Sequence, residues 1–177
     1  MGYFRVVRHR LPLSTEFIAF IAKTISSDVV YNSQCGIEAM TRSWCFLRWF
    51  GDVKEELVNL KKTTANTIEA TTRTSVTITQ QTLVQVFPHL LRDEDFALRS
   101  KLLGQRIVMD GSTCFVWGGT EERVTNVIAQ SDMLTPVIRL LANWEQVSWV
   151  FEKALISSNF QWRSMPVDEK HLSAGLG

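Results

Sequence analysis

The clearest hydrophobic pattern lies near the C-terminus, between residues 133 and 157. Apolar side chains recur there at spacings of three and four residues, the period of one face of an α-helix: Val137, Leu141, Trp144, Phe151 and Leu155. Asp132 just before the stretch and Pro136 near its start are typical of a helix N-terminus. The pattern predicts one helix over 133–157, with Trp144 on the side that faces the core.

A second apolar stripe begins near Cys35. It continues through Ile37, Met40, Trp44 and Leu47 and resumes at Val53, Leu57 and Leu60. Gly51 and Asp52 interrupt it. Asp52 followed by Glu55 resembles a capping box that starts a new helix, whereas a glycine inside a continuous helix costs only about 1 kcal/mol. We favour a kink or break at Gly51, and shorter helices are expected at 15–26, 94–103 and 121–130.

Three segments have the composition of β-strands. Residues 106–109 and 113–117 flank Asp110-Gly111, a pair that is typical of a two-residue hairpin turn, and residues 3–8 are a third candidate. The threonine-rich stretch 63–82 fits either a strand or a helix, and we assign a helix because predicted helices surround it. The sequence therefore predicts a mainly α, helical-bundle-like fold with a small β-hairpin, and an α+β fold is the alternative.

Composition places the chain among ordinary globular proteins. Its 177 residues suit one domain, 1–177, and 45% hydrophobic with 21% charged residues exclude general disorder. Three cysteines are too few for a disulfide scaffold, and no stretch of about 20 apolar residues predicts a membrane span. A net charge of +1 gives no overall attraction to nucleic acid.

The first 13 residues form a basic arm. Arg5, Arg8, His9 and Arg10 all precede the first acidic residue, Glu16. Such a segment is either an exposed arm or strand, which we favour, or a mitochondrial targeting segment. We therefore expect an intracellular protein, cytoplasmic in the first interpretation and mitochondrial in the second.

Motifs for catalysis or cofactor binding are missing from the sequence. His9, His89 and His171 lie about 80 residues apart, and Cys35 and Cys45 do not have a common zinc-ligand spacing. The acidic run 93–95 suits the N-terminus of a helix better than a metal site. We predict no catalytic residue, no cofactor and no metal, which argues against an enzyme without deciding the matter.

The aromatic content is high, with six Trp, ten Phe and two Tyr. Trp44 and Trp49 are five residues apart, as are Trp144 and Trp149, so on a helix the members of each pair point roughly 140° apart. One member of each pair then meets solvent, a second layer of the same chain or another protein. We favour a partner protein, because tryptophan is enriched where proteins bind each other. The candidate interface residues are Trp49, Trp149, Arg42 and Trp162.

These features predict a non-enzymatic subunit that docks through tryptophan-bearing helix faces into a homo- or hetero-oligomeric assembly. A capsid- or nucleocapsid-like subunit and an accessory subunit of a large complex both fit this description. A protein partner or self-association is expected, and nucleic acid is not expected to be the primary partner. The alternative is a small intracellular enzyme or ligand-binding domain whose site is assembled from distant residues.

Overall fold

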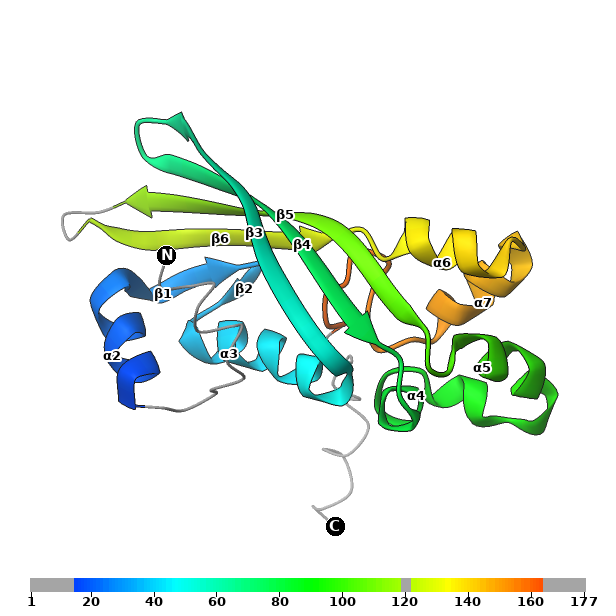
Figure 1. The fold of residues 1–177 in the computed structure, drawn as a ribbon. Helices are drawn as coiled ribbons and strands as arrows, with labels where there is room; N and C mark the ends of the chain where they lie inside the picture. Colours follow the sequence, from blue (N-terminus) through cyan, green and yellow to red (C-terminus); the bar gives the residue numbers. More distant parts are fainter. Residues whose placement is uncertain (1–14, 119–121, 164–177) are drawn as a thin grey trace, which may run out of the picture.

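The computed structural model describes residues 15–118 and 122–163 and shows a curved six-stranded sheet with helices packed against it (Figure 1). The strand order is β2-β1-β6-β5-β4-β3. All neighbouring strands pair antiparallel except β1 and β6, which are parallel. The mainly α prediction is therefore wrong, because the fold is α+β. The basic arm 1–13 and the predicted strand 3–8 lie outside the described residues.

The helices gather at the two ends of the sheet (Figure 1). α2 and α3 lie beside β1 and β2, whereas α4 to α7 lie at the opposite end. The strands are β1 (Ile25–Tyr31), β2 (Gln34–Cys35), β3 (Gly51–Thr64), β4 (Thr67–Thr77), β5 (Arg106–Gly118) and β6 (Arg123–Ser131). The helices are α2 (Thr15–Thr24), α3 (Ile37–Cys45), α4 (Gln80–Val86), α5 (Phe96–Leu102), α6 (Leu134–Leu141) and α7 (Trp144–Glu152), with short 3₁₀ turns η1 (Phe46–Trp49), η2 (Pro88–Leu91) and η3 (Asp93–Asp95).

The long hairpin of β3 and β4 replaces the helices predicted after Gly51 and over 63–82. Val53 and Leu57 are four residues apart, a spacing that places two side chains on one face of a helix and equally on one face of a strand. The burial pattern of β3 alternates, with Val53, Glu55 and Leu57 more buried than their neighbours. The many β-branched threonines of β4 favour the strand, and pairing between the two segments decides the outcome.

Asp110 and Gly111 lie inside the continuous strand β5, so the predicted hairpin turn is wrong. Gly111 pairs with Thr72 of β4 and with Ser131 of β6. A Cβ atom at position 111 would lie 2.5 Å from both the Gln130 carbonyl oxygen and the Ser131 Oγ. The glycine is needed for this close approach between strands rather than for a turn.

We expect Gly111→Ala to lower the free energy of unfolding by about 2 kcal/mol, because the added methyl group has to displace backbone atoms. Urea unfolding monitored by circular dichroism measures this loss. Gly118→Ala is the matched control on the same strand, since its Cβ would meet a Thr125 side chain at 3.1 Å rather than a backbone oxygen. Equal losses at the two positions would contradict the explanation.

The C-terminal half contains two further corrections. The helix predicted over 121–130 is instead strand β6, which is rich in β-branched residues. The helix predicted over 133–157 is broken at Ala142, whose φ of 49° is left-handed, and α7 begins anew because the Asn143 side chain accepts a hydrogen bond from the Gln146 N–H. Helices do form within the predicted ranges 15–26 and 94–103.

The break in the C-terminal helix exchanges the roles of its tryptophans. Trp144 is 72% exposed at the start of α7, although the pattern predicts that it faces the core. Trp149, the residue expected to point away, packs against the main core. Asp132, predicted as the cap of this helix, lies one residue before the N-cap position Met133, but its carboxylate accepts hydrogen bonds from the Thr135 N–H and hydroxyl in the first turn.

Two groups of buried apolar residues hold the sheet and the helices together. The larger one joins α4 to α7 and η1 to one end of the sheet, around Phe87 and Leu90. The smaller one lies between α2, α3 and the β1–β6 pair, around Val29 and Met40. Among the described residues, no helix is long and apolar enough to cross a membrane.

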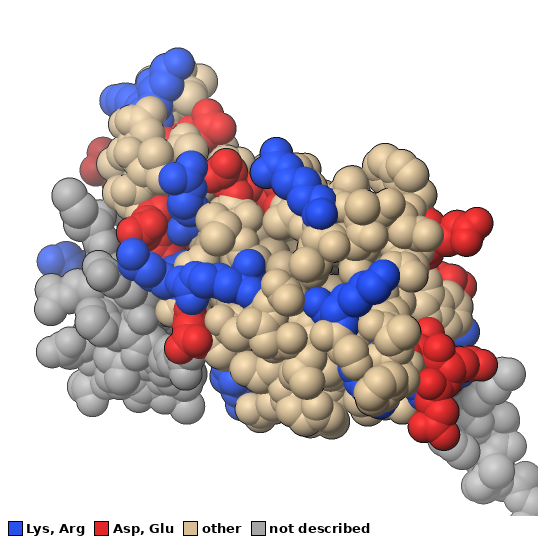
Figure 2. All heavy atoms as spheres, turned by 45° about the vertical axis from the view of Figure 1, so that its right-hand side comes forward, with Lys and Arg blue, Asp and Glu red and all other residues tan. Residues whose placement is uncertain are grey.

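Charged side chains are interspersed on the face formed by the end of the molecule that carries α4 to α7 (Figure 2). Most of this face is uncharged, and it carries both basic and acidic residues.

Candidate functional site

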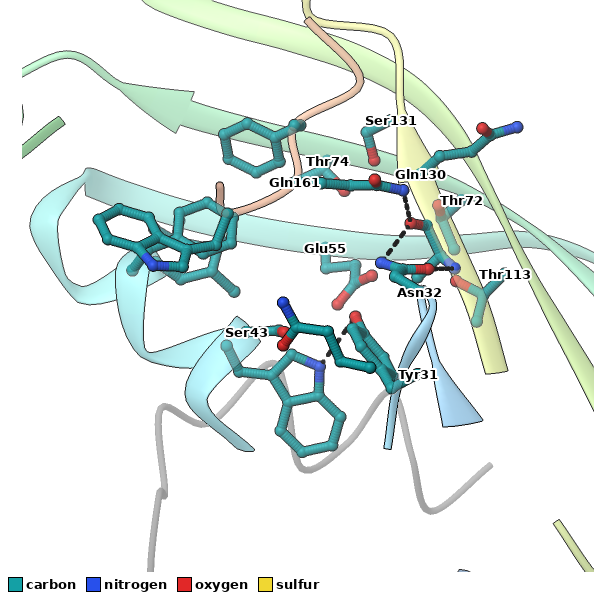
Figure 3. Close-up of a pocket in the computed structure, with 18 residues that line it drawn as sticks. Tyr31, Asn32, Ser43, Glu55, Thr72, Thr74, Thr113, Gln130, Ser131 and Gln161 are labelled. Carbon is teal, nitrogen blue, oxygen red and sulfur yellow. Dashed lines mark hydrogen bonds between the residues drawn. The ribbon is translucent and has the colours of Figure 1, made fainter. Parts of the chain in front are cut away.

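A cavity of about 100 Å³ lies between the two apolar groups, on the face of the sheet toward α3 (Figure 3). Distant parts of the chain form its walls: α3, η1, the four long strands, the end of β1 and the segment after α7. Its polar lining residues are Tyr31, Asn32, Gln34, Ser43, Glu55, Thr72, Thr74, Thr113, Gln130, Ser131 and Gln161, and its aromatic ones include Trp44, Phe46, Phe160 and Trp162. Such a concave lining, with apolar walls and a few polar groups, is typical of a small-molecule site.

Glu55 reaches this cavity because of the alternation along β3. Its neighbours Lys54 and Glu56 point to the other side of the strand, where they form a salt bridge with a 2.7 Å separation. The register places Glu55 opposite Thr74 of β4. Thr72, Thr74 and Thr113 are all buried and contribute hydroxyl groups to the same cavity. The carboxyl group therefore lies among hydroxyls rather than among bulk water.

The carboxyl group of Glu55 is in an unusual electrostatic environment. Its Oε2 atom is buried and has no hydrogen-bond partner among the described residues. Burial raises the pKa of Glu55 to about 7, because water is no longer available to stabilise the charged form. No Lys, Arg or His is among the described residues that line the cavity. At neutral pH the group is thus present in both protonation states, which is what a general acid or base requires.

Aromatic rings form the wall opposite the sheet. The Trp44 Nε1–H donates a hydrogen bond of 3.2 Å to the Tyr31 hydroxyl oxygen, and the two rings meet edge to face. Phe46 and Trp162 are stacked with their centroids 6.0 Å apart. These contacts give the cavity apolar sides around the Glu55 carboxyl group.

The structure brings together two of the four predicted interface residues. Trp49 and Trp162 pack against each other with centroids 5.0 Å apart, and Trp162 also lines the cavity. Arg42 is exposed on α3. Trp149 lies on α7, where its Nε1–H donates to Asp95 Oδ1 at 2.9 Å. A role of these residues at a partner surface stays a prediction.

A second titratable cluster surrounds Trp149. The His89 Nε2 lies 3.0 Å from the Trp149 carbonyl oxygen, and a carbonyl only accepts, so Nε2 carries the proton. Burial lowers the pKa of His89. The His89 Nδ1 and Asp95 Oδ2 atoms are buried without hydrogen-bond partners among the described residues. Neither residue lines the cavity, and the Asp95 contact ties η3 to α7.

Sequence reasoning missed Glu55 because it treated the residue as part of a helix cap. The signal that could have identified it is an acidic residue between Val53 and Leu57 in an alternating strand pattern, followed by a β-branched partner strand. Within 15–118 and 122–163, no group of three or more His, Cys, Asp or Glu side chains could hold a metal ion. Cys35, Cys45 and Cys114 are free thiols.

Comparisons with known proteins place the fold. A family model described as the BZIP transcription factor 1 C-terminal domain matches residues 1–49, less than a third of the chain, so it does not assign the family. No curated protein matches. Among solved structures, a SnoaL-like polyketide cyclase from Agrobacterium tumefaciens is similar, with 13% identity, a TM-score of 0.53, and coverage of 79% of this chain and 92% of that one. TsrD from Streptomyces laurentii has 14% identity, a TM-score of 0.53, and coverage of 80% and 90%.

These structural similarities show an α+β fold like that of the SnoaL-like proteins, with a curved mixed sheet and helices. The predicted helical assembly subunit is therefore wrong. The alternative, a small enzyme or ligand-binding domain whose site is assembled from distant residues, agrees better with the fold. The cavity around Glu55 has that construction, since its walls come from segments between Tyr31 and Trp162.

Proposed function

We propose that this protein is a small enzyme in which Glu55 moves a proton to and from an uncharged carbonyl compound bound in the cavity. The observation that carries the proposal is the Glu55 carboxyl group, whose Oε2 is buried and has no hydrogen-bond partner in the described part of the chain. Burial also raises the pKa of Glu55 to about 7. A base of that pKa is half ionised at neutral pH and can both take and return a proton. Buried carboxyl groups that serve only structure are normally paired.

The lining supports an uncharged ligand. Without a basic side chain among the described lining residues, nothing compensates the charge of a carboxylate or phosphate, and Glu55 itself repels it. The aromatic wall suits the flat faces of a ring or a conjugated chain. The Agrobacterium protein is named a polyketide cyclase, which is why we place carbonyl compounds first.

The proposed chemical step is proton removal next to a carbonyl group. The ionised Glu55 takes the proton from the carbon, the C–H electron pair forms a C=C bond, and the carbonyl oxygen becomes an enolate oxygen. Hydroxyl groups of Thr72, Thr74 and Thr113 are available to donate hydrogen bonds to that oxygen. In D₂O the proton on Glu55, now a neutral acid, is replaced by a solvent deuteron, and transfer of that deuteron to the carbon gives C–H exchange without net reaction.

Deuterium exchange tests this function without knowledge of the natural substrate. We expect the protein to accelerate C–H exchange of at least one of cyclohexanone, 1-tetralone and acetylacetone in D₂O, followed by NMR. The rate should rise with pH through about 7, because the ionised form is the base. Glu55→Gln should lower it by roughly 100-fold or more, the usual contribution of a general base.

The matched control is Glu69→Gln, an exposed carboxyl group on the neighbouring strand β4. This variant should catalyse C–H exchange of the ketones at the wild-type rate. Equal rates in wild type and Glu55→Gln, or binding of these ketones without any exchange, would contradict an enzymatic role for Glu55.

A further inference from the structure

A second pocket, of about 210 Å³, adjoins the cavity. Its described lining residues are Val30, Asn32, Ser33, Asn126, Ile128 and Gln161. Asn32 and Gln161 line the cavity as well, so these two side chains form the wall between the two spaces. Figure 3 shows both side chains directed at the same point of β6, where they meet the backbone of Ala129.

Asn32 is a firmly held part of this wall. It follows the last residue of β1 and, with Ser33, forms the two-residue turn to β2, with φ angles of 45° and 71°. Its side chain accepts a hydrogen bond from the Ala129 N–H at 2.8 Å and donates one to the Ala129 carbonyl oxygen at 3.0 Å. The amide of Asn32 thus continues the pairing with β6 beyond the point where β1 ends.

Gln161 is the more weakly held part. Its side chain donates one hydrogen bond, from Nε2 to the Ala129 carbonyl oxygen at 2.8 Å. It belongs to the segment after α7, which has left regular secondary structure except for the isolated bridge between Ile156 and Trp162. One side-chain hydrogen bond holds Gln161, whereas two hold Asn32.

The second pocket has the chemistry to hold an extension of a ligand. Val30 and Ile128 are apolar, whereas Ser33 and Asn126 are polar, and no charged residue is among the described lining. The Asn126 Oδ1 atom is buried and has no hydrogen-bond partner among the described residues. This pocket therefore fits an uncharged group, apolar with room for one N–H or O–H donor.

We propose that Gln161 determines substrate length: its side chain closes the end of the catalytic cavity and excludes compounds that extend into the second pocket. This inference rests on the proposed function for its catalytic readout. Because Asn32 and Gln161 line both spaces, removal of the Gln161 side chain would join the second pocket to the cavity.

The test compares Gln161→Ala with Gln161→Leu, which keeps most of the side-chain volume but cannot donate the hydrogen bond. The probes are cyclohexanone and 4-butylcyclohexanone. We expect wild type and Gln161→Leu to catalyse exchange of cyclohexanone at least tenfold faster than exchange of 4-butylcyclohexanone. In Gln161→Ala the ratio of these two rates should be at least tenfold lower. In Gln161→Ala the butyl compound should also shift the backbone amide NMR signals of Asn126 and Ile128.

The two readouts separate failure of this inference from failure of the proposed function. If the Asn126 and Ile128 signals shift only in Gln161→Ala and no variant catalyses exchange, the role of Gln161 as the barrier between the pockets is supported and the proposed enzymatic function is contradicted. If Gln161→Ala exchanges cyclohexanone normally, keeps the wild-type ratio between the two ketones and shows no signal shifts, the proposal that Gln161 limits substrate length is wrong. Should Gln161→Ala not fold by circular dichroism, Gln161→Ser, which also shortens the side chain, takes its place with the same expected outcomes.

Discussion

Glu55→Gln is expected to stabilise the folded protein at pH 8 by on the order of 3 kcal/mol while it removes the proposed activity. The folded-state pKa of about 7 lies above the ordinary value of 4.5, so the folded protein holds this proton more tightly than the unfolded chain. The contribution of the protonated group to stability is complete below pH 4.5 and is lost as pH rises through 7. Glutamine avoids that loss because it never ionises.

Urea unfolding of both proteins between pH 4 and pH 8 measures this effect. The difference between Glu55→Gln and wild type should be small at pH 4, grow between about pH 4.5 and 7, and level off above pH 7. Glu69→Gln, at an exposed site on β4, should show no such growth. A difference that does not change with pH would mean that the pKa of Glu55 is not raised in the folded protein, which would contradict its proposed role as a base that titrates near pH 7.

Trp149→Ala is expected to lower the free energy of unfolding by about 3 kcal/mol, whereas Trp144→Ala should change it by less than about 0.5 kcal/mol. Trp149 packs on the main core, meets the His89 ring edge to face at 5.8 Å and donates to Asp95. Its removal leaves the Asp95 carboxylate without that donor, which adds to the lost packing. Trp144 is 72% exposed and forms no comparable contact among the described residues.

Thermal and urea unfolding of the two variants gives the comparison, and Trp144→Ala is the matched control on the same helix. Trp149→Phe separates the two contributions, because it keeps an aromatic ring but cannot donate to Asp95. We expect Trp149→Phe to lose less than half as much stability as Trp149→Ala. A greater loss for Trp144→Ala than for Trp149→Ala would mean that the helix continues through Ala142, as the hydrophobic pattern alone predicts.

The sequence predicted local structure correctly where a few neighbouring residues determine it. The acidic side chain of Asp132 meets Thr135 as a capping residue does, and helices begin and end close to the predicted limits at 15–26 and 94–103. Such contacts span three or four residues, so the sequence contains all of their partners. A small enzyme or ligand-binding domain with a site built from distant residues was also open from the sequence, but only as the alternative.

Long-range pairing decided everything that distinguishes the sheet from a helical bundle. Val53 and Leu57 have a spacing that suits both a helix and a strand, and the choice depends on pairing with β4. Gly111 lies next to an aspartate, as in a hairpin turn, but its role comes from β4 and β6 on either side.

Glu55 shows the same limit at the site. Its position is plain in the sequence, yet its raised pKa arises only when α3, the neighbouring strands and the segment after α7 exclude water from one carboxyl group. Burial is a property of surfaces brought together by the whole fold, and the energy of a charge depends on that burial. The sequence by itself determined which chemical groups are available, and only the tertiary structure determined which of them is removed from water.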